Sequence, residues 1–404
     1  AAGLALFWAA AGAAAGFGRP RALAFAVALA AAEALRGVVL TGFPWAQPGH
    51  IWIETPVAQM AAWVGPDGLT LFTLLAAALP VALGIRGGVA AAALLAAAFG
   101  LGTLRLGVPL AAEATAPIVR LVQPNADQRQ KWEPARARAL FDRLLEMTRA
   151  TGPAPVALTI WPETSVPYLM DTSPGALWEI GEAGGGAPVI AGIQRSDGGG
   201  LRYWNSLAIA GVEGEVLGVY DKHHLVPFGE YIPFGDLAHA WFGLKAFATQ
   251  EGYGYSAGPG PRLLEVPGIG AILPLICYEA VFPAIPLRAP GRARVMVQIT
   301  NDAWFGTQTG PFQHLALARL RAIEQGLPLL RSANTGVTAV IDARGRLLEA
   351  LALGTTGVID APLPASLPPT FFARIGRGPV WLLLVSLALA LAARRRLDGR
   401  GAKG

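Results

Sequence analysis

The chain has 404 residues, of which 53% are hydrophobic and only 15% are charged, and its mean hydropathy is +0.45. Soluble proteins carry about 25% charged residues, so this composition excludes an ordinary soluble protein. The net charge of +5 does not indicate nucleic-acid binding, because the basic residues form no single patch and several of them flank apolar segments.

The N-terminal part of the chain predicts membrane helices, because a long stretch with so few charges is hard to solvate in any other way. Some of the expected spans are shorter than the roughly 20 residues that a bilayer core requires. For any single span the alternative is a buried helix of a soluble protein. The five expected spans are 2–17, 22–40, 69–85, 89–106 and 379–393. The only charged residues before position 115 are Arg19, Arg21, Glu33, Arg36, Glu54, Asp67, Arg86, Arg105 and Glu113.

Arginines beside these spans predict their orientation. Residues 394–396 are three arginines that directly follow the last span, so the positive-inside rule places this end in the cytoplasm. Counting back, the turn at Arg86 is cytoplasmic, whereas residue 1 and the polar region before the last span lie outside. Arg36 and Arg105 do not fit the rule, and each is expected near the outer end of a span.

The polar region runs from about residue 115 to 369 and alternates strand patterns with helical patterns, which predicts α/β layers. Helical periodicity is clearest at 133–150 and 312–325. Strands are expected at 118–122, 156–160, 189–193, 205–210, 216–220, 272–276, 295–299, 337–341 and 347–351.

Cys277 is the only cysteine of the chain and directly follows an apolar strand pattern. A free cysteine is most often a small buried residue of the core. However, Glu163 and Lys222 also follow strand patterns, and strand ends are where open α/β sheets place their sites. A carboxylate, an ammonium and a thiol together support nucleophilic acyl chemistry: the carboxylate takes the thiol proton and the ammonium stabilises the oxyanion. His223 and His224 have no second ligand cluster beside them, so no metal site is expected.

Glu163, Lys222 and Cys277 in this order resemble the nitrilase, or carbon–nitrogen hydrolase, superfamily. Longer strings that span most of the chain resemble the apolipoprotein N-acyltransferase family more closely. These strings are RG at 36–37, LTGFPW at 40–45, WPET at 161–164, KHHLVPFGE at 222–230, ICYE at 276–279 and TNDAWFG at 300–306.

This resemblance implies an α-β-β-α sandwich for residues 115–369, joined to a multi-span helical membrane region. The expected domains are a membrane region at 1–114, the catalytic domain at 115–369, and a last span with a basic tail at 370–404. Family members carry eight spans, so five spans imply that three membrane helices are missing and that the sequence is incomplete. Cleavage of a signal peptide is the alternative, although it does not account for the helices.

The activity that the resemblance implies is acyl transfer in lipoprotein maturation, at the outer face of the bacterial inner membrane. Glu163 activates Cys277, which takes an acyl chain from a phospholipid as a thioester, and Lys222 supports the oxyanion. The diacylglyceryl-modified N-terminal cysteine of an apolipoprotein then accepts the chain through its α-amine. No cofactor is expected, and the protein is expected to be a monomer. A membrane-tethered amidase acting on a small amide is the alternative enzyme, and an inactive membrane scaffold is the alternative outside enzymes.

Further residues are predicted to bind substrate around this triad. The backbone N–H of Tyr278 is also expected to serve the oxyanion, and Glu230 is expected either to orient Lys222 or to hold the substrate amine. A glycine-punctuated aromatic stretch at 234–255 is expected to form a lid that faces the membrane. The residues predicted to bind substrate are Glu230, Tyr278, Glu279, Trp132 and Asn205, and a structural ion pair is the alternative for Glu279.

Overall fold

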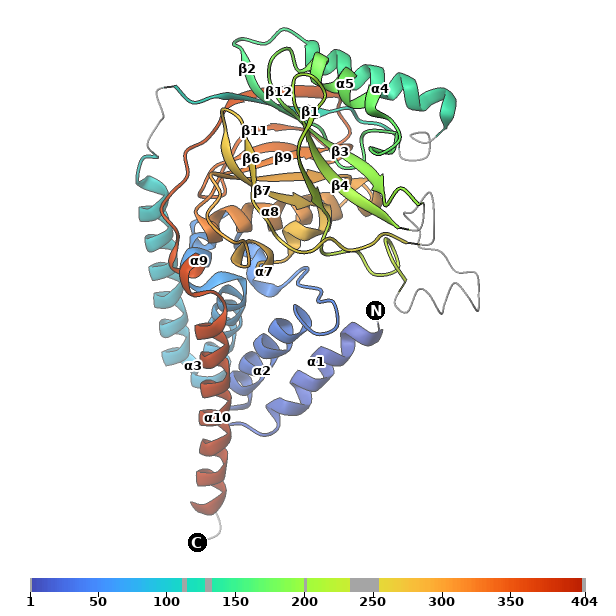
Figure 1. Cartoon of the computed structure of the whole chain (residues 1–404). Coiled ribbons are helices and arrows are strands. Elements are labelled where there is room, and N and C mark those ends of the chain that lie inside the picture. The colour runs from blue at the N-terminus through green and yellow to red at the C-terminus, as the bar shows by residue number, and fades with distance from the viewer. Residues whose placement is uncertain (1, 111–114, 128–132, 200–201, 233–253, 402–404) are drawn as a thin grey trace. The chain divides into compact units, whose positions relative to one another are not determined.

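The chain divides into two units, each described here by itself (Figure 1). The computed structural model describes residues 2–110, 115–127, 133–199, 202–232 and 254–401. The helical unit comprises Ala1–Leu110, Ile323–Gly326 and Pro368–Gly404, and the α/β unit comprises Ala111–Ala322 and Leu327–Leu367.

The helices of the first unit lie where apolar spans were predicted. The spans at 2–17, 22–40 and 379–393 correspond to α1, α2 and α10, and α3 contains the other two. Gly84 separates these two inside α3 with a left-handed backbone (φ +58°, ψ −138°) that glycine adopts without steric cost. The elements are α1 (Ala2–Ala15), α2 (Arg21–Arg36), η1 (Pro48–Trp52), η2 (Pro56–Met60), α3 (Ala61–Gly107), α9 (Phe371–Ile375) and α10 (Gly378–Gly401).

Among the described residues, one helical segment is long and apolar enough to cross a membrane, namely Pro56–Gly107. Its most apolar stretch has a mean hydropathy of 2.1. Ala2–Ala15 and Gly378–Arg394 are apolar but shorter. The crossing of a membrane by five spans stays a prediction.

The interior of the helical unit contains ion pairs. Glu33 forms an ion pair with Arg36 and accepts a hydrogen bond of 2.8 Å from Trp8 Nε1. Arg377 Nε lies 2.7 Å from Asp67 Oδ2. Removing one partner of such a pair leaves an uncompensated buried charge, so these residues are tolerated in an apolar bundle only together.

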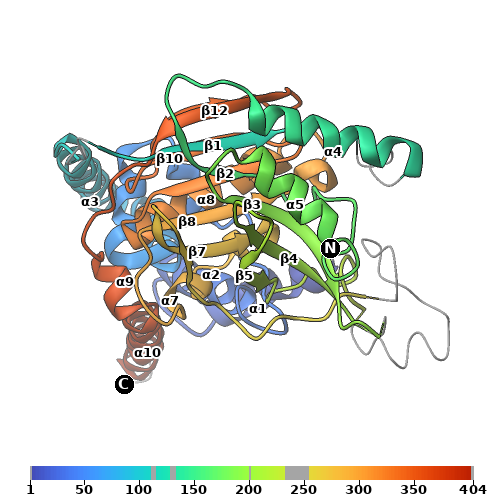
Figure 2. The same ribbon diagram turned by 45° about the horizontal axis from the view of Figure 1, so that its top comes forward.

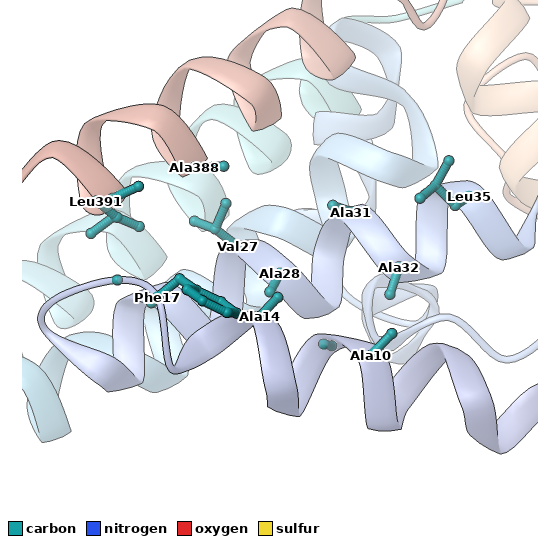
Figure 3. A pocket seen from close by; sticks show the side chains of 14 residues that line it. Ala10, Ala14, Phe17, Val27, Ala28, Ala31, Ala32, Leu35, Ala388 and Leu391 are labelled. Atoms are coloured by element: carbon teal, nitrogen blue, oxygen red, sulfur yellow. The ribbon is translucent and has the colours of Figure 1, made fainter. Parts of the chain in front are cut away.

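Small side chains at the contacts of α1, α2 and α10 leave a cavity of about 390 Å³ in this unit (Figure 3). Ala10, Ala14 and Ala28 line it together with the larger side chains of Phe17 and Leu391. All of its lining residues are apolar, so the cavity offers no acid, base or nucleophile.

The described strands of the α/β unit form two sheets of six (Figures 1 and 2). The first has the order β12-β1-β2-β3-β4-β5 and the second β11-β10-β9-β8-β7-β6. Their bounds are β1 (Ile118–Gln123), β2 (Val156–Ile160), β3 (Val189–Ser196), β4 (Tyr203–Ala210), β5 (Val216–Asp221), β6 (Leu264–Val266), β7 (Gly270–Ile276), β8 (Val295–Thr300), β9 (Leu329–Ala333), β10 (Thr338–Ile341), β11 (Leu347–Leu351) and β12 (Gly357–Pro362).

The two sheets pack face to face and helices cover their outer faces (Figure 2). Val119 and Leu158 of the first sheet share one buried cluster with Val297 and Val340 of the second. The helices α4 (Pro134–Arg149) and α5 (Pro174–Ala183) pack on the outer face of the first sheet, where Phe141 lies in a second cluster. The helix α8 (Gly310–Gln325) lies outside the second sheet (Figure 1). It contacts the short elements η3 (Cys277–Val281) and η4 (Asp302–Phe305), and a further short helix is α7 (Ala284–Leu287). The predicted α-β-β-α sandwich is confirmed.

The strands that the sequence did not predict have physical reasons for their weak signals. The strand β6 is only three residues long, and β12 carries Gly357, Asp360 and Pro362, which are rare in strands. The strand β9 places Arg331 in the sheet interior, where the side chain forms an ion pair with Asp302 that no local pattern reveals.

Candidate active site

The residues of the predicted triad follow three strands that end at one edge of the sandwich. In the first sheet β2 and β5 run in the same direction, because β3 is parallel to β2 and two antiparallel steps connect β3 to β5. Glu163 follows β2 and Lys222 follows β5. In the second sheet β7 and β8 are parallel, and Cys277 follows β7. The strand ends converge as the sequence analysis expected.

Cys277 occupies a strained turn between β7 and η3. Its φ of +50° lies in the left-handed region, which costs a residue with a Cβ atom free energy. Such strain persists only where the surroundings fix it. The residue is only 4% exposed, so the thiol lies inside the pocket and not on the surface.

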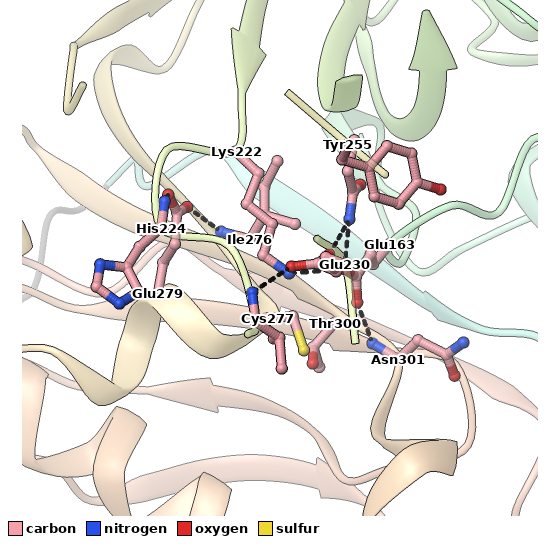
Figure 4. A network of polar contacts seen from close by, with 12 residues as sticks. Glu163, Lys222, His224, Glu230, Tyr255, Ile276, Cys277, Glu279, Thr300 and Asn301 are labelled. Carbon is pink, nitrogen blue, oxygen red and sulfur yellow. Dashed lines mark hydrogen bonds and ion pairs between the residues drawn. The ribbon is translucent and has the colours of Figure 1, made fainter. Parts of the chain in front are cut away.

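Lys222 lies buried between two carboxylates (Figure 4). Its Nζ is 2.8 Å from Glu230 Oε1 and 3.3 Å from Glu163 Oε1. Burial alone lowers the pKa of the ammonium, but the charges of Glu230 and Glu163 outweigh it and raise the pKa well above its ordinary value. The residue is therefore a cation at neutral pH.

Glu163 is held by donors on both of its oxygens. Asn205 Nδ2 donates to Oε1 at 2.8 Å. The backbone N–H of Asn301, directly after β8, donates to Oε2 at 2.9 Å (Figure 4). Because both oxygens are fixed, the carboxylate keeps one orientation toward the pocket that it shares with Cys277.

The thiol of Cys277 is protonated in the resting site. Burial and the charge of Glu163 raise the pKa of the thiol well above its ordinary range, although Lys222 and a hydrogen bond with Thr300 oppose that rise. The thiolate therefore has to form during the attack, with a base close by to take the proton.

The pocket around these groups has a volume of about 290 Å³, a polar end and apolar walls. Glu163, Lys222 and Cys277 line it together with the aromatic residues Trp304 and Phe305. An apolar wall beside a polar reaction centre suits a substrate whose carbonyl group carries a hydrocarbon chain.

The predicted substrate-binding residues have different surroundings. Glu230 and Asn205 line the pocket, and Asn205 Nδ2 also lies 3.1 Å from Glu230 Oε1. Tyr278 and Glu279 are buried beside the pocket and do not line it. Trp132 lies outside the described residues, as does most of the predicted lid, residues 233–253.

Glu279 connects the segment before Cys277 with the segment after Lys222. Its Oε1 accepts hydrogen bonds from Tyr220 Oη at 2.8 Å, from the backbone N–H of His223 at 2.8 Å and from that of His224 at 3.1 Å. Its Oε2 accepts from the backbone N–H of Ile276 at 2.8 Å. Burial raises the pKa of this carboxyl group, and these four donors oppose the rise.

The sequence analysis missed several residues that touch the triad. Asn301 and Thr300 lie within the string TNDAWFG, which marked the family but indicated no role for either residue. Gln298 and His314 both contact the backbone carbonyl of Cys277, from β8 and α8. No local pattern identifies them, because only the packing of α8 on the second sheet brings His314 to Cys277. In the described part of the chain, no three His, Cys, Asp or Glu residues are grouped so that they could hold a metal ion.

The chain is similar in sequence to known proteins over nearly its whole length. Residues 118–367 match the carbon–nitrogen hydrolase family, and residues 1–79 match the apolipoprotein N-acyltransferase N-terminal domain. An apolipoprotein N-acyltransferase of Bradyrhizobium diazoefficiens is 41% identical over 94% of this chain and 74% of its own length. One of Brucella melitensis biotype 1 is 39% identical over 93% of this chain and 73% of its own length.

Among solved structures, a mutant of the Nesterenkonia AN1 amidase from the nitrilase superfamily is similar to this chain. It has 16% sequence identity and a TM-score of 0.47, and the match covers 67% of this chain and 98% of the amidase.

Proposed function

Because the chain belongs to the apolipoprotein N-acyltransferase family of carbon–nitrogen hydrolases, we propose that Cys277 carries the transferred acyl chain as a thioester. The enzyme is an acyltransferase that acylates the amino group of apolipoproteins. The observation that carries the proposal is the joint position of Glu163, Lys222 and Cys277 in one pocket with apolar walls.

In the first half-reaction Cys277 attacks the acyl ester of a phospholipid. Glu163 takes the thiol proton, the sulfur bonds to the carbonyl carbon, and the ester oxygen leaves as lysophospholipid after receiving that proton. Lys222 and the backbone N–H of Tyr278 stabilise the oxyanion of the tetrahedral intermediate. The lasting positive charge of Lys222 suits this role.

In the second half-reaction the α-amine of the apolipoprotein's diacylglyceryl-cysteine attacks the thioester. Glu163 removes a proton from the attacking amine, an amide bond forms, and the thiol of Cys277 is released and protonated. Protons and acyl groups balance over the two steps, and no cofactor takes part.

Glu230 and Glu279 have supporting roles in this scheme. Glu230 orients Lys222, because its Oε1 lies closer to Nζ than Glu163 does, and its Oε2 is fixed by the backbone N–H of Val226 at 2.8 Å. Glu279 holds the segment after Lys222 and the segment before Cys277 at a fixed distance from each other through its four hydrogen bonds. Asn205 orients Glu163 and Glu230, and the binding of substrate by Trp132 stays a prediction.

A small-amide hydrolase with the same triad is not favoured. The relatives that align along nearly the whole chain are acyltransferases, and residues 1–79 match an N-terminal domain of that family. A hydrolase of small amides has no use for such an apolar region.

A chase experiment tests the transfer. The purified enzyme is first acylated with a phospholipid labelled in its acyl chain and then given a diacylglyceryl-modified peptide with a free N-terminal cysteine amine. We expect the label to move to the peptide as an amide, faster than it appears as free fatty acid by about a hundredfold or more. A peptide with an acetylated α-amine is the control and should receive no label. Release of the label mainly as fatty acid would support the hydrolase instead.

The protein is a membrane enzyme by family, and we propose its arrangement in the membrane. Residues 1–114 and 370–404 form the membrane region with five spans, and residues 115–369 form a catalytic domain on the outer side of the cytoplasmic membrane, active as a monomer. The proposal rests on the arginines at 394–396 and at Arg86. It also rests on chemistry, because the thiol has to meet apolipoproteins after their export.

Labelling of Cys277, the single thiol of the chain, tests this orientation. A membrane-impermeant maleimide is applied to cells whose outer membrane alone is permeabilised, and Cys277→Ser serves as the control for labelling elsewhere. We expect labelling without lysis of the inner membrane. Labelling that needs inner-membrane lysis would place the catalytic domain in the cytoplasm.

A further inference from the structure

A buried polar cluster reaches Cys277 from the side of the second sheet, away from Glu163 and Lys222. It consists of Gln298 and Asp302, at β8 and η4, and His314 on α8, none of which is more than 1% exposed. His314 Nε2 lies 3.0 Å from the backbone carbonyl oxygen of Cys277, and Gln298 Nε2 donates to the same oxygen at 3.2 Å. The other ring nitrogen, Nδ1, lies 2.9 Å from Asp302 Oδ1.

The carbonyl oxygen that this cluster holds belongs to the peptide group of the predicted oxyanion donor. The C=O of Cys277 and the N–H of Tyr278 are parts of one planar trans peptide, so they point in opposite directions. Fixing the oxygen therefore fixes the direction of the N–H. The peptide group needs such support because the left-handed φ of Cys277 strains the turn, and a strained turn relaxes unless its surroundings hold it.

Both neutral forms of His314 provide this support. Burial and the charge of Arg331 lower the pKa of the ring, so it carries one N–H at neutral pH. With the proton on Nε2, His314 donates to the carbonyl itself. With the proton on Nδ1, the ring donates to Asp302, and the amide of Gln298 bridges from the carbonyl to Nε2, from which it lies 3.2 Å. In each form a polar atom is needed at the position of Nε2.

We infer that His314 and Gln298 are positioning residues that aim the backbone N–H of Tyr278 at the oxyanion. The inference rests on the proposed function, since it concerns the attack of Cys277 on a carbonyl group. Donors on a peptide carbonyl also polarise that peptide and strengthen the hydrogen bond that its N–H donates. Asp302 fixes the ring, and its carboxylate is in turn held by Arg331.

Two substitutions at position 314 separate the two ring nitrogens. The amide of glutamine occupies about the place of Nε2, whereas the amide of asparagine occupies about the place of Nδ1. His314→Gln therefore keeps a polar atom at the Cys277 carbonyl, and His314→Asn keeps the Asp302 contact and loses the carbonyl. Gln298→Met removes the second donor at nearly constant volume.

Two rates are measured in each variant after circular dichroism has shown that it is folded. One is single-turnover acylation of Cys277 by a labelled phospholipid, which passes through an oxyanion. The other is alkylation of Cys277 by iodoacetamide, a displacement at a saturated carbon that forms none. A purely structural defect lowers both rates together, whereas a misaimed N–H lowers only the first.

We expect His314→Asn and Gln298→Met to acylate about ten- to a hundredfold more slowly than wild type, which is less than the loss of a whole oxyanion donor. Their alkylation rates should stay within about threefold of wild type, as should both rates of His314→Gln. Three results would overturn the inference. The first is acylation within about threefold of wild type in His314→Asn and Gln298→Met, and the second is an equal loss of acylation and alkylation in these variants. The third is an equal loss of acylation in His314→Asn and His314→Gln. If His314→Asn does not fold, Gln298→Met decides by the same two rates. A wild-type enzyme that forms no adduct on Cys277 would instead overturn the proposed function.

Discussion

Cys277→Ser is expected to abolish the acyl-enzyme while leaving the fold unchanged. The side chain is buried and the pKa of its thiol is already raised above the ordinary range, so proton transfer from Cys277 to Glu163 is unfavourable even in the wild type. A serine hydroxyl is far less acidic than a thiol and is the weaker nucleophile at this position. Labelled phospholipid, followed by gel electrophoresis and release with hydroxylamine, measures the adduct.

Cys277→Ala is the matched control for this variant, because it lacks any nucleophile at the position. Both variants should give signals at background, and their melting temperatures should match that of the wild type. A hydroxylamine-sensitive adduct that persists in Cys277→Ala would show that another residue carries the acyl chain.

Lys222→Met is expected to lower acyl transfer by more than about a hundredfold at every pH, because an oxyanion donor is lost. The change also leaves Glu163 and Glu230 facing each other without the cation between them, which costs about 3–5 kcal/mol of stability for a broken buried pair. The acylation rate of the folded fraction is therefore the quantity to compare. Rates within about tenfold of wild type would exclude Lys222 from the oxyanion site.

In Glu163→Gln the loss of acylation is expected to depend on pH, whereas the loss in Lys222→Met persists at every pH. The variant loses the base, so acylation near neutral pH falls by about a hundredfold or more. The charge of Glu163 contributes to the raised pKa of the Cys277 thiol, so its removal lowers that pKa. As the pH rises, the thiol of Glu163→Gln ionises without a base, so its acylation rate recovers. In Lys222→Met the thiol loses the cation that favours its ionisation, so the acylation rate does not recover.

The exposed carboxylate of Glu349 on β11 offers a matched control, and Glu349→Gln should leave the rate unchanged. Parallel pH profiles for Glu163→Gln and Lys222→Met would contradict this division of roles.

The sequence predicted those parts of the fold that local patterns determine. The strands that carry Glu163, Lys222 and Cys277 are apolar runs that stop at a polar or reactive residue, so their positions and the convergence of their ends were predictable. The break between two apolar spans was predicted at Arg86, because that charge interrupts the hydrophobic pattern, and the structure bends nearby, at Gly84.

Partners far apart in the sequence were not predictable. His314 reaches Cys277 across 37 positions, and the backbone N–H of Asn301 reaches Glu163 across 138. The strand β9 was missed because Arg331 reads as a surface residue until its pairing with Asp302 is known. Glu279 shows the same limit, since the four donors of the protein that its carboxylate binds come from both sides of the site and were not predictable.

The central claim is that the thiol of Cys277 carries the acyl chain of a phospholipid. Mass spectrometry of peptides from wild-type enzyme, incubated with a phospholipid of defined acyl chain and quenched at acidic pH, tests it most directly. The account predicts that the peptide containing Cys277 gains the mass of the corresponding fatty acid less one water, and that hydroxylamine at neutral pH removes it. An acylated peptide that lacks Cys277, or an unmodified Cys277 peptide under conditions of turnover, would contradict it.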